Sequence, residues 1–213
     1  MAQNTTGIRR VLGNPRLFDL TQNLFGAARI RREFVQSALR AKSGERILDV
    51  GSGTGDMLAY LPDGVEYVGV EPNARYCHAA RERFGARARF ICGFYEEPLA
   101  ASLGRFDKVI LCGVLHHLDD EPAKRLFAIL ASRLEPGGAV ASIDPVFDPD
   151  QSGVARFLIS MDRGGNVRRD TGYRALAASS FRVVDGEVRH RTMPPYTHFV
   201  MSCREPLPEG PVT

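Results

Sequence analysis

Apolar residues in the middle of the chain fall into short continuous runs, separated by segments in which apolar residues recur at helical spacing. Short runs bounded by turn residues are typical of buried strands, and the helical spacing predicts amphipathic helices between them. Strands that alternate with helices are typical of an α/β fold with a parallel sheet. The predicted strands are residues 46–50, 67–70, 88–92, 106–112 and 139–143, and the predicted helices are residues 57–61, 74–84 and 122–134.

Segments of another kind lie on both sides of this region. Residues 15–41 carry apolar residues at helical spacing with arginines between them, which predicts one or two amphipathic helices before the first strand. After the last predicted strand, helices are expected at residues 154–161 and 173–178. Alternating residues over 181–190 and 197–204 predict an antiparallel hairpin.

Three glycines at every second position follow the first predicted strand. Gly51, Gly53 and Gly55 stand in Ile-Leu-Asp-Val-Gly-Ser-Gly-Thr-Gly-Asp, the sequence of residues 47–56. Glycine lets a backbone approach a ligand closely, and the free amides at the start of the next helix favour an anionic group. A cofactor site is therefore expected at this turn. The alternative is a glycine-rich turn that serves packing alone.

An acid, Glu71, follows the second predicted strand. At the end of the second strand of a βαβ unit, a carboxylate can accept hydrogen bonds from two ribose hydroxyls. The preceding glycines depart from the dinucleotide pattern Gly-x-Gly-x-x-Gly, because the third glycine comes one residue early. This spacing disfavours a nicotinamide cofactor. The alternative role for Glu71 is to cap the helix predicted from Ala74.

Four segments in this order resemble the motifs of class I S-adenosylmethionine-dependent methyltransferases. They are Asp49 to Gly55, Glu71, Asp107 to Leu118 with its Val-Leu-His-His-Leu exit, and Leu134 to Gly138. Residues 18–25 are similar to the N-terminal segment of the ubiquinone and menaquinone C-methylase branch. The resemblance implies a Rossmann-like, seven-stranded and mostly parallel sheet of order 3-2-1-4-5-7-6, with helices on both faces and an N-terminal helical cap.

The same resemblance implies a single methyltransferase domain. Its expected parts are a helical cap over residues 15–43, a cofactor-binding core over 44–145, an acceptor-side insertion over 146–180 and a closing β-hairpin over 181–204.

The family's pattern also implies which residues contact the cofactor. Glu71 is expected at the ribose, Cys112 beside the methionine portion, and the segment around Phe18 over the cofactor. Phe94 stands where the family commonly has an acid for the adenine amino group. Phe94 or Tyr95 could stack on the adenine ring instead, although plain packing explains both equally well. The full expected set is Phe18, Asp49, Gly51, Ser52, Gly53, Gly55, Glu71, Pro72, Phe94, Tyr95 and Cys112.

Two adjacent histidines, His116 and His117, follow the fourth predicted strand. Neighbouring side chains diverge on a strand and on a helix, so the pair is unsuited to one metal ion, and no metal is expected. His116 is the candidate catalytic residue, expected to face the acceptor as an orienting group or base. The alternative is a structural histidine in the turn.

Arginine dominates the charge of residues 146–204, which carry nine arginines, six acids and no lysine. Guanidinium groups bind carboxylates and phosphates in paired geometry, which favours an acceptor that carries negative charge. Solvated surface charge is the alternative reading of each arginine. The expected acceptor-binding residues are Asp144, Arg156, Arg163, Arg168, Tyr196 and His198.

Composition narrows the classes of protein. With 213 residues, 44% hydrophobic and 25% charged, the chain can bury the core of one globular domain. The net charge of +3 and the absence of a basic run argue against nucleic acid. No apolar run is long enough to cross a bilayer or to form a signal peptide, so a cytoplasmic protein is expected. Four separated cysteines without a Cys-x-x-Cys pair indicate neither a zinc site nor a disulfide framework.

These motifs together imply methyl transfer from S-adenosylmethionine to a small-molecule acceptor, by in-line displacement at the sulfonium methyl, with S-adenosylhomocysteine as product. A monomer or homodimer is expected. One alternative is a non-catalytic S-adenosylmethionine-binding partner protein, and the other is an NAD-dependent oxidoreductase. The identity of the acceptor and of the methylated atom stays open.

Overall fold

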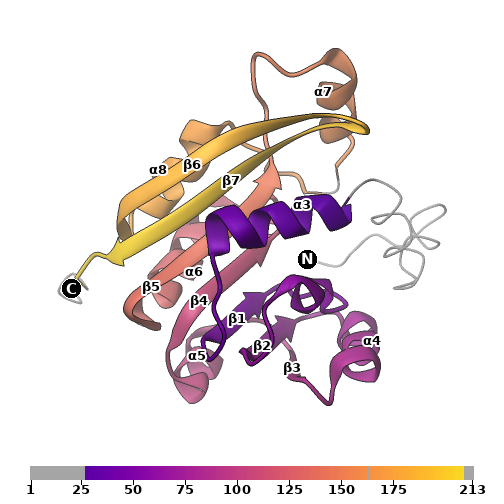
Figure 1. The fold of residues 1–213 in the computed structure, drawn as a ribbon. Helices are drawn as coiled ribbons and strands as arrows, with labels where there is room; N and C mark the ends of the chain where they lie inside the picture. Colours follow the sequence, from indigo (N-terminus) through magenta and orange to yellow (C-terminus); the bar gives the residue numbers. More distant parts are fainter. Residues whose placement is uncertain (1–26, 163, 209–213) are drawn as a thin grey trace.

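A seven-stranded sheet forms the centre of the molecule (Figure 1). The computed structural model describes residues 27–162 and 164–208. The strand order is β3-β2-β1-β4-β5-β7-β6, in which β7 alone pairs antiparallel with both of its neighbours. The predicted order and the closing hairpin are thereby confirmed. The strands are β1 Arg46–Val50, β2 Glu66–Glu71, β3 Ala88–Cys92, β4 Phe106–Cys112, β5 Leu134–Pro145, β6 Phe181–Thr192 and β7 Pro195–Pro206.

Helices cover both faces of the sheet, as predicted, and a separate apolar cluster lies beneath each layer. One cluster joins α5, α6 and α8 to the sheet, and the other joins α3, η1, η2 and α4 to it. The helices are α3 Ala27–Phe34, η1 Val35–Leu39, η2 Asp56–Tyr60, α4 Ala74–Phe84, α5 Glu97–Leu103, η3 Leu115–His117, α6 Asp120–Ser132, α7 Gly153–Ser160 and α8 Asp170–Ala178.

The continuous apolar runs of β1 and β4 arise because both faces of these strands are buried. Successive side chains point to opposite faces, so Leu48 and Val109 enter one cluster while Ile47 and Ile110 enter the other. The two strands pair in parallel register, which brings their carboxyl ends side by side. This edge of the sheet is where an α/β fold binds its ligands.

Three elements differ from the sequence prediction. The helix expected over residues 57–61 is the short 3₁₀ turn η2, because Pro62 and Gly64 leave too few residues for an α-helix. Helix α5 was not predicted, although Pro98 in its first turn suits a helix start. Strand β5 begins at Leu134, which pairs with Phe106, so the expected turn before this strand is part of it.

The N-terminal cap is described from Ala27 onward, so the helix expected before it lies outside the described residues. Helix α3 and η1 bury Phe34 and Leu39 against the sheet. On the other side of the sheet, α8 places the Tyr173 hydroxyl where it donates to the Pro145 carbonyl at 2.9 Å. None of the helices within residues 27–162 and 164–208 is long and apolar enough to cross a bilayer.

Candidate functional site

The glycine turn after β1 is tied to the end of β2 by Glu71. One carboxylate oxygen, Oε2, accepts a hydrogen bond from the Gly53 amide at 3.0 Å, and Oε1 accepts one from the Asn73 amide at 2.8 Å. Burial raises the pKa of Glu71, and these two amides oppose that rise. The two residues that the sequence predicted at the cofactor are therefore in direct contact.

The three glycines play different parts in this turn. All have positive φ, and a β-carbon on Gly51 would lie 2.8 Å from the Val114 side chain. A β-carbon on Gly55 would lie 2.8 Å from the Phe90 ring, whereas one on Gly53 would meet no atom within 4 Å. Gly51 and Gly55 thus serve close packing, and Gly53 faces open space that a ligand can approach.

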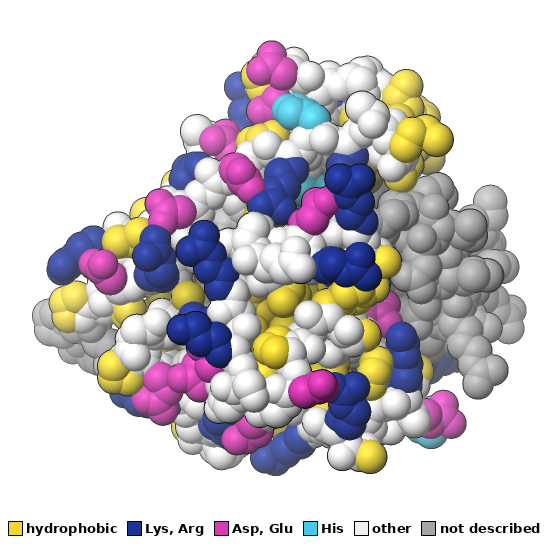
Figure 2. All heavy atoms as spheres, viewed as in Figure 1, with side chains coloured by type: hydrophobic (Ala, Val, Ile, Leu, Met, Phe, Trp, Pro, Cys, Tyr) yellow, Lys and Arg dark blue, Asp and Glu magenta, His cyan; other side chains and the backbone are white. Residues whose placement is uncertain are grey.

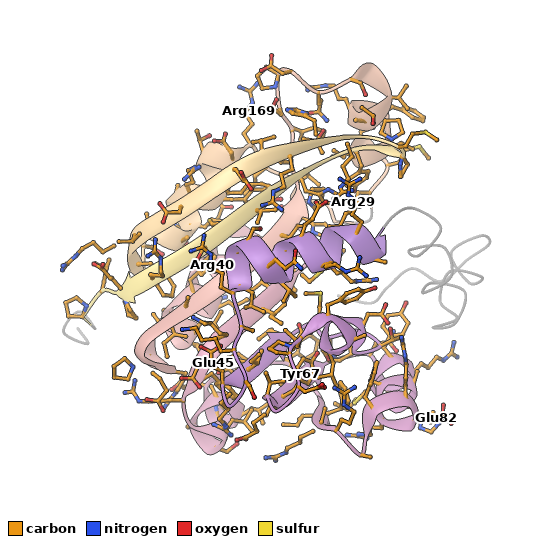
Figure 3. All side chains as sticks on the ribbon, in the orientation of Figure 1. Arg29, Arg40, Glu45, Tyr67, Glu82 and Arg169 are labelled. Carbon is orange, nitrogen blue, oxygen red and sulfur yellow. The ribbon has the colours of Figure 1, made fainter. Side chains whose placement is uncertain are left out.

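Asp49 lies fully buried at the carboxyl end of β1. Tyr67 lies in the interior of the molecule (Figure 3), and its hydroxyl donates a hydrogen bond to Asp49 Oδ2 at 2.5 Å. Burial raises the pKa of Asp49 to about 7, although the bond from Tyr67 opposes the rise. Its second oxygen, Oδ1, and the Ser52 hydroxyl are buried without a hydrogen-bond partner among the described residues. Polar atoms left without partners at a glycine turn fit a ligand that would bind them.

The residues predicted near adenine lie in different environments. Tyr95 is buried within the apolar cluster beneath α5 and α6, while Phe94 is 71% exposed. Pro72 is exposed after β2, and Cys112 is half-buried at the end of β4. Packing therefore accounts for Tyr95, and Phe94 is the described ring that is free to stack on a ligand. Phe18 lies outside the described residues.

His116 lies between two carboxylates beyond the ends of β4 and β5. Its Nδ1 is 2.8 Å from Asp144 Oδ1, and its Nε2 is 3.2 Å from Asp162 Oδ1. Burial would lower the pKa of His116, but the hydrogen bonds to the two carboxylates outweigh it and raise the pKa to about 9. The imidazole is therefore protonated at neutral pH in this structure.

Two further predicted residues, Tyr196 and His198, lie beside this group on β7. The Tyr196 hydroxyl donates to Asp162 Oδ2 at 3.0 Å, and its ring lies 4.8 Å from the His198 ring. Burial lowers the pKa of His198 to about 4, which keeps it neutral at neutral pH. The structure thus brings Asp144, His116, Tyr196 and His198 together, and their role at an acceptor stays a prediction.

The arginines predicted to bind an anionic acceptor do not gather there. The five N–H donors of Arg168 are all used within the chain, by Asp120 and by the carbonyls of three residues. Arg168 therefore anchors the loop before α8 and has no free donor. Arg156 is exposed on α7, with its guanidinium 5.3 Å from the centroid of the Phe147 ring. Arg163 lies outside the described residues.

Other arginines of the hairpin line a groove on the outer surface instead. Arg189 and Arg191 border this groove together with Arg29 of α3, and basic side chains gather on this face (Figure 2). Arg191 already bonds to Glu33 at 2.7 Å. The arginine-rich composition of residues 146–204 therefore reflects surface charge and internal anchoring in large part.

Sequence reasoning missed two residues that the structure places at the site. Asp162 lies between the helices expected at residues 154–161 and 173–178, and only the fold brings it to His116. Arg31 was noted as one of several arginines between apolar residues, yet its side chain is only 11% exposed and pairs with Asp56 after the glycine turn. No local motif marks either residue.

Comparisons with known proteins bear on the class of domain and on the fold. Residues 47–138 match a family model described as a methyltransferase domain. Acetylserotonin O-methyltransferase of Mus musculus is 33% identical over 150 residues, which is 62% of this chain and 38% of the mouse protein. The structure of TnmH is 25% identical with a TM-score of 0.66, covering 93% of this chain and 60% of TnmH. Mitomycin 7-O-methyltransferase MmcR is 20% identical with a TM-score of 0.65, covering 95% of this chain and 62% of MmcR.

The chain spans less than two thirds of the length of each of these three proteins. The expected likeness to quinone C-methylases stays a prediction. The matched segment includes the glycine turn, Glu71 and His116, while the sheet around it has the expected strand order. Residues 47–138 therefore form a methyltransferase domain, set in a fold that this chain shares with solved methyltransferases.

Proposed function

We propose that this chain transfers a methyl group from S-adenosylmethionine to an oxygen atom of a small-molecule acceptor. The observation that carries the proposal is the contact between Asp144 and His116, at the same sheet edge as the glycine turn. The mouse relative and MmcR are both O-methyltransferases by name, which supports oxygen as the methylated atom.

The residues around the glycine turn suit the methyl donor. S-adenosylmethionine supplies a methyl group that its positive sulfonium sulfur activates. Glu71 is fixed by two backbone amides, and its remaining lone pairs can accept from ribose hydroxyls. Asp49 and Glu71 are buried carboxyl groups, and the positive charges of a bound donor would favour their ionised forms.

Deprotonation of an acceptor hydroxyl falls to His116, because a hydroxyl is a weak nucleophile until it loses its proton. Asp144 fixes the ring through Nδ1, and Nε2 points at Asp162. The imidazole must be neutral to accept a proton. In the proposed reactive state, the acceptor hydroxyl replaces Asp162 at Nε2, so that only Asp144 still stabilises the protonated ring.

The pH dependence of kcat/KM tests this role of His116. The activity of the wild type should rise with pH through the pKa of the free enzyme's histidine, which is about 9. Asp162→Asn keeps a hydrogen-bond acceptor for the Tyr196 hydroxyl and removes one negative charge beside His116. The pKa of His116 should therefore fall, and the rise in kcat/KM should move toward about pH 7. His116→Gln should abolish the rise. An unchanged profile in Asp162→Asn would refute the proposed contact.

A screen of acceptors, scored by release of S-adenosylhomocysteine, tests the choice of oxygen and the expectation of an anionic acceptor. Each acceptor in the screen is a phenol or enol that carries a carboxylate. It is compared with one analogue in which an amine replaces the hydroxyl, and with a second analogue that lacks the carboxylate. Turnover of the hydroxyl compounds alone supports the proposal, and turnover of the amines alone contradicts it. We also propose that the protein is cytoplasmic, which cell fractionation tests. We propose that it acts as a monomer or homodimer, which light scattering tests.

A further inference from the structure

Arg31 is a buried cation on the helix that precedes the methyltransferase core. It lies on α3, outside the matched residues 47–138, and its side chain is 11% exposed. Arg29 of the same helix is 78% exposed and lies on the side that faces the hairpin (Figure 3). The two arginines therefore point to different surroundings, and only Arg31 turns toward the glycine turn.

The contacts of Arg31 leave part of its guanidinium unused. Nη2 is 3.2 Å from Asp56 Oδ2, at the first residue after Gly55. Nη1 is buried and has no hydrogen-bond partner within residues 27–162 and 164–208. Asp56 also pairs with Arg83 at 2.5 Å, so one carboxylate faces two guanidinium groups. This cluster retains a net positive charge and a free buried donor.

The charge of Arg31 acts at the carboxyl ends of β1 and β4. Burial raises the pKa of Asp49 to about 7 and that of Cys112 to about 12, and in both cases the Arg31 charge opposes the rise. Cys112 marks the place where the methionine portion of the donor is expected. Arg31 is therefore close to the methionine end of the proposed donor site.

A carboxylate in this place needs a cation beside it, because Asp49 and Glu71 would repel it. The described residues contain one other arginine with a buried N–H that lacks a partner, Arg133. Arg133 follows α6, and its carbonyl accepts from the Phe106 amide at the start of β4, the opposite edge of the sheet. Among the arginines that the structure describes, Arg31 alone combines a free buried donor with a place at the carboxyl edge.

We propose that Arg31 binds the carboxylate of the methionyl portion of S-adenosylmethionine through Nη1, an inference that rests on the proposed function. The glycine turn and Glu71 then hold the rest of the donor, and α3 supplies the positive charge that faces the carboxylate. The cap helix thereby becomes part of the cofactor site rather than a packing element alone.

Isothermal titration with two ligands tests the proposal: S-adenosylhomocysteine and its decarboxylated analogue, 5′-S-(3-aminopropyl)-5′-thioadenosine. A hydrogen bond to a charged group contributes about 1.5 to 3 kcal/mol, which is a factor of about 10 to 100 in affinity. Arg31→Ala should lower the affinity for S-adenosylhomocysteine by that factor and the affinity for the decarboxylated analogue by less than about twofold. Arg31→Lys should retain part of the preference, and the exposed Arg32→Ala should retain all of it.

The ratio of the two affinities separates binding from a structural role. If Arg31→Ala lowers the affinity for both ligands equally, Arg31 acts by holding the glycine turn and the inference is wrong. The same conclusion follows if Asp56→Asn abolishes the preference for S-adenosylhomocysteine over the decarboxylated analogue as fully as Arg31→Ala does. If the wild type binds both ligands equally, no residue reads the carboxylate and the inference is also wrong. If the wild type binds neither ligand, the proposed function itself fails.

Discussion

Replacement of His116 by asparagine should remove a pH-dependent contribution to stability. Burial opposes the charged ring, yet Asp144 and Asp162 raise the pKa of His116 to about 9, against about 6.5 in an unfolded chain. A difference of about 2.5 units at about 1.4 kcal/mol each corresponds to about 3 kcal/mol. Because the folded pKa is raised, this stabilisation is fully present below about pH 6.5 and is lost as the pH rises through about 9.

Urea unfolding of the wild type and of His116→Asn between about pH 6 and pH 10 measures this contribution. The difference between their free energies of unfolding should fall by about 3 kcal/mol over that range. Groups that both proteins share cancel in the difference. His78→Asn is the matched control, because His78 is exposed on α4 and lies 3.6 Å from Glu82. Its difference from the wild type should change little with pH.

Two results would exclude a protonated His116 at neutral pH. One is a difference between wild type and His116→Asn that stays constant from about pH 6 to pH 10. The other is an NMR titration of the His116 ring that gives a pKa below about 7. Either would show that the two carboxylates do not hold the ring protonated.

Two further predictions concern packing and the glycine turn. Arg168→Ala should lower the free energy of unfolding, measured by urea titration, by about 2 to 4 kcal/mol, because it leaves buried carbonyls unpaired. Arg169 is exposed, so Arg169→Ala should change the free energy of unfolding by no more than about 0.5 kcal/mol. Gly55→Ala should destabilise the fold by about 1 to 3 kcal/mol, because Gly55 has a positive φ and a β-carbon there would contact Phe90. Gly53→Ala should lower the stability less than Gly55→Ala does and should lower the affinity for S-adenosylhomocysteine more. Urea unfolding measures the stability, and calorimetry measures the affinity. Equal affinities in the two glycine variants would contradict the different parts assigned to them.

Much of the fold could be predicted because its signals are local. The apolar runs of β1 and β4 mark strands buried on both faces, and the one-residue difference in glycine spacing separates this turn from a dinucleotide site. Glu71 was expected at the cofactor because a βαβ unit always places the end of its second strand beside the first turn. The contact between Glu71 and Gly53 shows that the end of β2 lies beside the glycine turn, while the role of Glu71 at a cofactor stays a prediction.

The acceptor side could be predicted only in part, because its residues meet through the fold. His116 lies in the turn that follows β4, and Asp144 lies at the end of the neighbouring strand β5, so their approach follows from strand order. Asp162 comes from a polar loop whose path depends on α7 and α8, and no periodicity reveals it. Residue type alone was also a poor guide to Arg168, whose donors are all taken by groups inside the chain.

Isothermal titration shows whether the glycine turn and Glu71 bind S-adenosylmethionine. The wild type should bind S-adenosylmethionine and not NAD. Glu71→Ala should lose affinity by at least about 10-fold, because a carboxylate that accepts from two hydroxyls is removed. The control Glu66→Ala, on the exposed start of the same strand, should bind as the wild type does. Unchanged affinity in Glu71→Ala, or binding of NAD in place of S-adenosylmethionine, would show that the glycine turn and Glu71 do not form an S-adenosylmethionine site.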